Sequence, residues 1–156
     1  MLASTRSAGA SSRTFVVAGP FMDDVVVNKA AIIERCVQRV REVYEDRPDH
    51  LVDDLTRQDS IVLNLQRACE ASIDLAMHLV RRHGLGVPQD SRSAFDLLVD
   101  AGKLDPTLAD PLKAMVGFRN VAVHDYTRLD LSIVRAIIER HTDDLLSFAS
   151  ASLQEA

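Results

Sequence analysis

The chain has 156 residues, which is enough for one domain with a hydrophobic core and too few for two domains of ordinary size. Its 47% hydrophobic and 26% charged residues are typical of a soluble globular protein, and no apolar run reaches the length of a membrane span. The net charge of −5 repels a nucleic-acid backbone, so an RNA-binding function would require a local basic patch.

Residues 1–21 are rich in Ser, Ala, Thr and Arg and contain no acidic residue. They lack the long apolar stretch of a secretory signal, and we expect a poorly ordered extension. Residues 22–156 are expected to form one helical domain, because Trp is absent and Ala, Leu, Val and Arg are abundant. Two cysteines, Cys36 and Cys69, are too few for a disulfide framework, which favours buried thiols in a reducing cytoplasm.

Apolar residues recur at helical spacing along most of residues 22–156, and no segment alternates with the period of a strand for long enough to require one. The segment 59–83 is apolar on two faces, which predicts a position at the centre of a bundle. Asp105-Pro106 and Asp110-Pro111 each join a capping carboxylate to a proline suited to the first helical position, so they indicate two starts of one helix. We therefore predict an all-α bundle of about five helices, over residues 25–45, 59–83, 91–101, from 105 or 110 to about 124, and 130–153.

Polar residues on the central segment allow two interpretations. Asp74 and His78 are four residues apart, a spacing that fits a metal or acid–base pair, but no third ligand stands nearby and a helix-stabilising pair is favoured. The Arg-Arg-His run at 81–83, Arg119 and Arg128 are candidates for a basic patch. For the run at 81–83 we favour a structural role in the last turn of the helix, where cations interact well with the helix dipole.

The stretch 119–126, Arg-Asn-Val-Ala-Val-His-Asp-Tyr, carries the most informative group of polar side chains. Arg119 supplies a permanent cation whose planar fork fits phosphate oxygens, and His124 can give or take a proton near neutral pH. Metal-free cleavage of RNA needs such a cation and such a proton carrier. The alternative is that both side chains cap a helix end by binding free carbonyls. One pair is short of a full catalytic set, and a two-fold dimer would supply a second.

The R-x-x-x-x-H-x-Y pattern of Arg119, His124 and Tyr126 resembles the signature of the HepT-like branch of the HEPN domains. Further stretches resemble the helices and loops of that family, at residues 63–78, 84–88, 94–98 and 115–118. The resemblance covers roughly residues 23 to 150. It implies a metal-independent endoribonuclease toxin that needs no cofactor, forms a two-fold homodimer and is neutralised by an MntA-type minimal nucleotidyltransferase antitoxin.

The same resemblance implies a role for each polar residue of the motif. Arg119 and His124 are the expected catalytic residues, and Asn120 is expected to orient them. Tyr126 is the expected acceptor of AMP from the partner, and the added charge and bulk would block RNA. A second interpretation stays open, in which the chain is a non-catalytic helical module that binds or regulates a nucleotidyltransferase.

The helix that leads into the motif is expected to contribute to the two-fold contact. One subunit supplies too few catalytic groups, so the motif helices of two subunits should meet in one cleft. The apolar side chains that we expect on this interface are Leu112, Met115, Val116 and Phe118.

Overall fold

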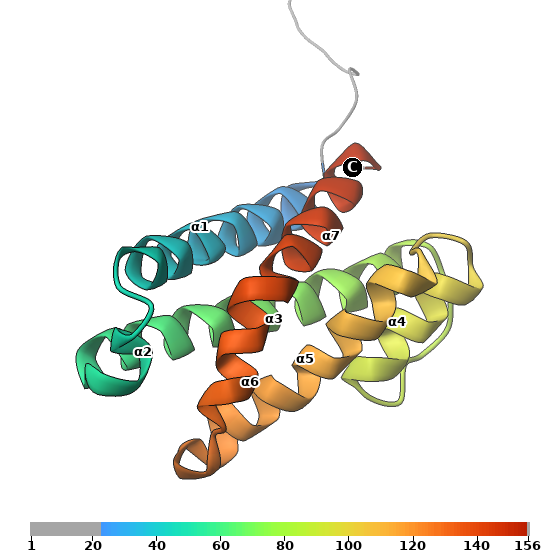
Figure 1. Ribbon diagram of the computed structural model, residues 1–156. Coiled ribbons are helices and arrows are strands. Elements are labelled where there is room, and N and C mark those ends of the chain that lie inside the picture. The colour runs from blue at the N-terminus through green and yellow to red at the C-terminus, as the bar shows by residue number, and fades with distance from the viewer. Residues whose placement is uncertain (1–22, 156) are drawn as a thin grey trace, which may run out of the picture.

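The computed structural model describes residues 23–155, so the extension expected at residues 1–21 lies outside the described part. Within that part every regular element is helical and no strand is found (Figure 1). The elements are α1 (Asp24–Asp46), α2 (His50–Asp53), α3 (Leu55–Arg82), α4 (Ser91–Asp100), α5 (Pro106–His124), the 3₁₀ turn η2 (Tyr126–Arg128), α6 (Leu131–Ala136), the π turn η3 (Ile137–His141) and α7 (Thr142–Gln154).

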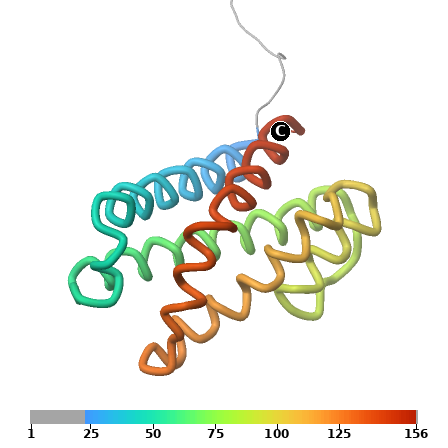
Figure 2. Tube along the Cα trace, viewed as in Figure 1, coloured from blue at the N-terminus to red at the C-terminus, as the bar shows by residue number. Residues whose placement is uncertain are grey.

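The predicted all-α bundle of about five helices is confirmed. The long helices are α1, α3, α4 and α5, and α6, η3 and α7 follow one another directly to form the fifth. Figure 2 shows this last helix crossing the pair formed by α1 and α3, with α4 and α5 on the other side of α3. No helix between residues 23 and 155 is long and apolar enough to cross a membrane.

Helix α3 is the central helix of the bundle. It packs against α1, α2, α4, α5 and α7, and it runs antiparallel to α1. Both of its predicted apolar faces are buried, and they carry side chains such as Leu65 and Leu75 on one face and Val62 and Val80 on the other. Cys36 and Cys69 are free and buried, as expected for small core residues.

Two helix starts differ from the sequence prediction. Helix α3 begins four residues early because the side chain of Asp54 caps it, accepting a hydrogen bond from the backbone N–H of Arg57. Helix α5 begins once, at Pro106, after the cap formed by Asp105. The second predicted start is wrong: Pro111 lies inside α5, where buried Leu112 holds the helix in place although one backbone hydrogen bond is lost.

The favoured pairing of Asp74 with His78 is also wrong, because both residues bind partners from the start of the chain's first helix. Asp74 pairs with Lys29 at 3.1 Å, and Nε2 of His78 lies 2.7 Å from Oδ2 of Asp23. Nη1 of Arg82 donates to the same Asp23 oxygen at 3.0 Å, so Arg82 of the run at 81–83 has a structural role. Antiparallel packing of α1 on α3 brings these groups together.

Asp23 joins the start of α1 to the end of α3, and we expect Asp23→Ala to destabilise the protein by about 1–2 kcal/mol. Its Oδ1 accepts from the backbone N–H groups of Val25 and Val26, while Oδ2 faces His78 and Arg82. Urea unfolding at pH 7 measures the loss. The matched control is Asp24→Ala, which removes a neighbouring exposed carboxylate of the first turn that is not the cap.

The contribution of Asp23 should also depend on pH. The hydrogen bond from His78 is the largest of the causes that hold the Asp23 pKa below its ordinary value. A carboxyl with a lowered folded pKa stabilises the fold above its unfolded pKa, about 4, and the gain is lost as the pH falls through the folded pKa. The difference in unfolding free energy between parent and Asp23→Ala should therefore shrink below about pH 4. An undiminished difference at pH 3 would contradict this.

Candidate active site

The predicted motif lies at the carboxyl end of α5. Arg119 and Asn120 lie inside the helix, His124 is its last residue, and Tyr126 opens the 3₁₀ turn that follows. The backbone N–H of Asp125 donates to the carbonyl of Val121 at 2.8 Å, so the helix continues through His124. Five residues along a continuous helix correspond to a rotation of about 140°. Arg119 and His124 of one subunit therefore leave the helix in different directions.

Arg119 lies against α3. Its side chain is only 18% exposed, and Nη2 lies 3.5 Å from Oε1 of Glu70. The Nε atom is buried and has no hydrogen-bond partner among residues 23–155. Burial raises the pKa of the neighbouring Cys69 thiol to about 12, so that thiol is neutral and does not compete for the guanidinium. Arg119 is thus a cation held against α3, with part of its side chain still exposed where a phosphate could bind.

His124 and Asn120 are less constrained. The imidazole of His124 is exposed at the end of the helix, and neither residue's side chain has a hydrogen bond to any residue in the range 23–155. No backbone carbonyl in that range accepts from the side chain of Arg119 or His124 either, so the geometry gives no support to the capping alternative. The orienting role of Asn120 stays a prediction.

Tyr126 is fixed by a contact that the sequence does not show. Its hydroxyl donates to Oδ1 of Asp59, in the second turn of α3, at 2.7 Å, while 41% of the residue is exposed. Burial and the hydrogen bond to Asp59 raise the pKa of Tyr126 to about 12. The phenol is therefore protonated at neutral pH, held in one orientation and still reachable from solvent.

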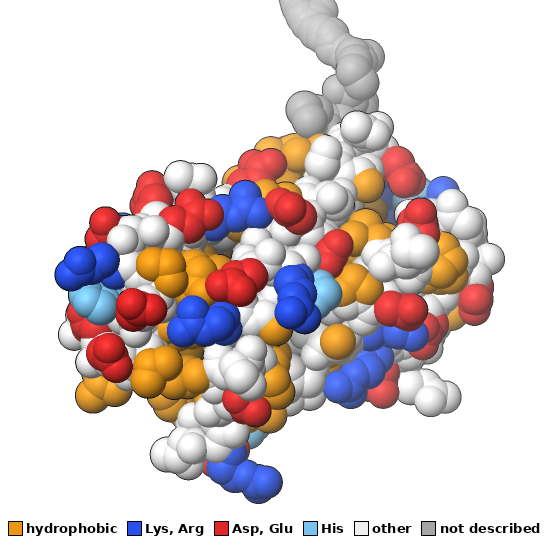
Figure 3. All heavy atoms as spheres, in the orientation of Figure 1, with side chains coloured by type: hydrophobic (Ala, Val, Ile, Leu, Met, Phe, Trp, Pro, Cys, Tyr) orange, Lys and Arg blue, Asp and Glu red, His pale blue; other side chains and the backbone are white. Residues whose placement is uncertain are grey.

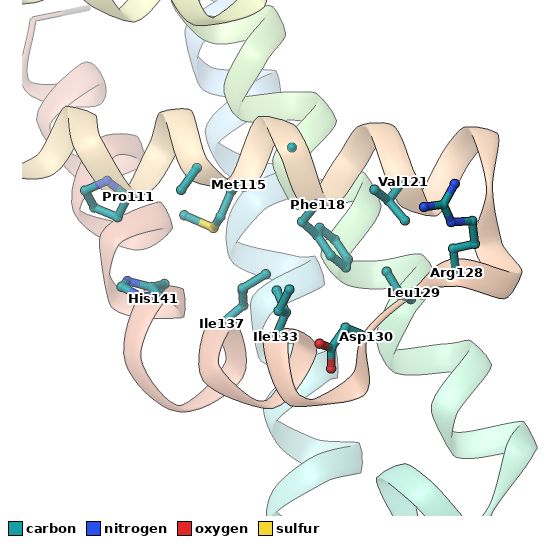
Figure 4. A pocket seen from close by; sticks show the side chains of 12 residues that line it. Pro111, Met115, Phe118, Val121, Arg128, Leu129, Asp130, Ile133, Ile137 and His141 are labelled. Atoms are coloured by element: carbon teal, nitrogen blue, oxygen red, sulfur yellow. The ribbon is translucent and has the colours of Figure 1, made fainter.

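An apolar groove runs along α5, between this helix and the segment formed by α6 and η3 (Figure 4). Its volume is about 540 Å³, and Met115, Phe118 and Val121 face Ile133 and Ile137 across it. We call it the α5–α6 groove. It is lined by Pro111, Ala114, Met115, Gly117, Phe118, Val121, Arg128, Leu129, Asp130, Ile133, Ile137 and His141.

The four side chains expected on a two-fold interface belong mainly to the core of one subunit. All are at most 5% exposed, because α5 packs them against α3, α4 and α7. A contact between subunits along this helix would instead use its exposed apolar residues, Val121 and Val123, and Ile133 of α6. The spacing of apolar residues identified the buried face of α5. It could not show whether that face packs inside one subunit or against a second subunit.

Three basic residues that were not among the predicted patch gather near Glu70, the partner of Arg119. Lys29 and Arg35 of α1 and Arg67 of α3 line a hollow of about 280 Å³ that also contains Glu70, the residue that pairs with Arg119. We call this the α1–α3 hollow. Arg35 and Arg67 have no acidic partner within residues 23–155, whereas Arg82 is occupied by Asp23. The sequence pattern placed Arg35 and Arg67 on the exposed faces of two helices. It did not show that these two helices pack side by side.

Elsewhere the surface carries mixed charge. Figure 3 shows acidic and basic side chains interspersed over one face of the molecule. The predicted patch residue Arg128 has an 82% exposed side chain, and its Nε lies 3.6 Å from Oδ2 of Asp125, the residue before the 3₁₀ turn. No group of three or more His, Cys, Asp or Glu residues suited to a metal ion occurs in the described part of the chain.

Known proteins resemble this chain in sequence and in fold. The sequence profile of the family described as ribonuclease HepT-like matches residues 33–152. An mRNA nuclease HepT of Shewanella oneidensis is 47% identical over 127 residues, which span 81% of this chain and 95% of that protein.

Two solved structures are similar throughout most of their length. A tri-AMPylated Shewanella oneidensis HEPN toxin in complex with its MNT antitoxin has a TM-score of 0.78 and 45% identity, covering 83% of this chain and 97% of that one. A toxin–antitoxin structure with AMP-PNP has a TM-score of 0.78 and 45% identity, covering 84% of this chain and 99% of that one.

Proposed function

This chain belongs to the ribonuclease HepT-like family, and from that premise we propose that it is a metal-independent endoribonuclease toxin controlled by a nucleotidyltransferase antitoxin. We assign RNA cleavage to Arg119 and His124, an orienting role to Asn120, and control to Tyr126. The observation that carries the assignment is Arg119 itself, a largely buried cation held by Glu70 in the same helix that ends at the exposed His124.

The proposed reaction uses the ribose 2′-hydroxyl as nucleophile. Its oxygen bonds to the adjacent phosphorus, the bond from phosphorus to the 5′-oxygen breaks, one proton leaves the 2′-hydroxyl and another reaches the 5′-oxygen. The products are a 2′,3′-cyclic phosphate and a 5′-hydroxyl. Arg119 stabilises the negative charge that gathers on the phosphoryl oxygens, and His124 carries a proton.

A two-fold dimer is part of the proposal because one subunit holds one proton carrier. Arg119 faces α3 while His124 lies at the exposed helix end, and no contact joins them in the described chain. A second copy, packed on the exposed apolar residues of α5 and α6, would bring two arginines and two histidines to one cleft. One histidine could then act as base and the other as acid.

The dimer can be tested by dilution with an inactive copy. The double variant Arg119→Ala/His124→Ala is co-expressed with the parent under separate tags, and cleavage is measured for mixed populations. If both subunits build one cleft, activity follows the square of the parental fraction, about a quarter at equal mixing. A linear fall to about half would show that each subunit works alone. Mixing with the exposed-site variant Arg140→Ala is the control and should cost no activity.

RNA binding also requires a basic path on an acidic protein, and we assign part of it to Arg35 and Arg67 in the α1–α3 hollow. Arg67→Ala should weaken RNA binding and lower the slope of log affinity against log salt by roughly 0.7 to 0.9, since one phosphate contact is lost. Filter binding across a salt series measures both quantities. Arg140→Ala removes an exposed arginine distant in sequence from this hollow and should leave the slope unchanged; equal slopes for all three proteins would reject the path.

The solved relatives are complexes with MNT or MntA antitoxins, and we propose a partner of the same class here. The alternative is a helical module that only binds such a partner. Cleavage of RNA by the purified chain without its partner distinguishes the two functions.

A further inference from the structure

The hydrogen bond between Tyr126 and Asp59 joins the two residues whose chemistry an AMP transfer would need. They are 67 positions apart in sequence, and their oxygens are 2.7 Å apart. The hydroxyl hydrogen points at the carboxylate, so the lone pairs of the phenol oxygen face away from it. No other hydrogen bond or ion pair to Asp59 is found within residues 23–155. The hydroxyl proton of Tyr126 is therefore the one group that the Asp59 carboxylate binds in this range.

Transfer of AMP to a phenol is a substitution at phosphorus. The phenol oxygen bonds to the α-phosphorus of ATP, the bond from that phosphorus to the bridging oxygen breaks, and pyrophosphate leaves. The phenol proton must go to an acceptor while the new bond forms. Because the phenol of Tyr126 stays protonated at neutral pH, little of it is present as phenolate before attack.

We propose that Asp59 of the toxin is the base for its own modification, accepting the proton of Tyr126 as the phenol oxygen attacks ATP held by the antitoxin. The inference rests on the control of Tyr126 proposed above and extends it: part of the catalytic machinery for neutralisation lies in the toxin chain. The geometry fits, since the carboxylate already accepts a hydrogen bond from the proton that must leave and 41% of Tyr126 is exposed to solvent.

The same arrangement makes the modified state different from the free state. Once the oxygen carries AMP it has no hydrogen to donate, and the new phosphodiester is an anion next to the carboxylate of Asp59. Loss of the hydrogen bond and like-charge repulsion both act to separate the 3₁₀ turn η2 from the start of α3. The AMP group is thereby directed outward, beside the end of α5 that carries His124.

The test is the rate of the first AMP addition to Asp59→Asn and Asp59→Glu, measured by intact mass with the cognate MntA-type partner, ATP and Mg²⁺. Asparagine keeps the size and an oxygen acceptor but is not a base, so kcat should fall about 100-fold with little change in the KM for the toxin. Glutamate restores a carboxylate and should recover most of the rate. Asp53→Asn removes a nearby exposed charge that does not contact Tyr126, and it should react like the parent.

Each result has a defined meaning. An Asp59→Asn protein that is modified as fast as the parent overturns the role of Asp59 and leaves the control of Tyr126 standing. A parent that takes no AMP at Tyr126 overturns both. A fall shown equally by Asp59→Asn and Asp59→Glu, with a raised KM and a lowered melting temperature, assigns Asp59 a structural role only and rejects the proposal.

Discussion

Arg119→Ala is expected to abolish detectable growth arrest and to lower RNA cleavage by about 10²- to 10³-fold, the range found when one preorganised donor to a developing anion is removed. The guanidinium is held against Glu70, so its position before RNA arrives is fixed, and alanine supplies no charge in its place. Arg119→Lys should also be impaired, because an ammonium cannot present the same planar set of donors. His124→Ala should lose about 10²- to 10⁴-fold through the missing proton carrier.

These losses must be separated from unfolding and from metal effects. The side chain of His124 is exposed, so His124→Ala should melt within a few degrees of the parent, while Arg119→Ala also loses packing against α3. Arg140→Ala is the matched control, since Arg140 is exposed and lies outside the motif. Cleavage of a labelled RNA should continue in EDTA. Variants as active as the parent, or a strict need for Mg²⁺, would reject the assignment.

The fold was largely predictable because its main determinant is local. Apolar residues at helical spacing mark the buried faces of α1, α3 and the last helix, and these faces are buried in the structure. The helix ends that depend on a single residue were less predictable. The predicted start at residue 59 missed the cap that Asp54 forms for α3, and Pro111 was predicted as a second start although α5 continues through it.

The site was predictable only as a list of residues. The motif gave Arg119, His124 and Tyr126, yet their partners Glu70 and Asp59 come from α3 and are set by the antiparallel packing of α3 and α5. Periodicity shows which face of a helix is buried and leaves open which helix covers it. The mistaken pairing within α3 had the same cause, since charged residues four apart can equally well bind a neighbouring helix.

Tyr126→Phe is expected to give a toxin that cleaves RNA and is not neutralised by AMP transfer. Phenylalanine keeps the ring and removes the acceptor oxygen, together with its bond to Asp59. The chain's other tyrosine, Tyr44, offers no substitute acceptor: it is buried, and its hydroxyl is engaged by Glu139 and Arg135. With partner, ATP and Mg²⁺, the parent should gain mass on the Tyr126 peptide and stop cleaving RNA.

The Phe variant under the same conditions should gain no mass and keep cleaving. Tyr44→Phe is the matched control, because it removes a phenol oxygen from the only other tyrosine and should leave modification and neutralisation intact if the protein stays folded. Inhibition of the Phe variant that requires only partner and no ATP would show that binding contributes to neutralisation separately from AMP transfer. AMP found on Tyr44, or ATP-dependent neutralisation of the Phe variant, would place control at another residue, because phenylalanine has no oxygen with which to attack phosphorus.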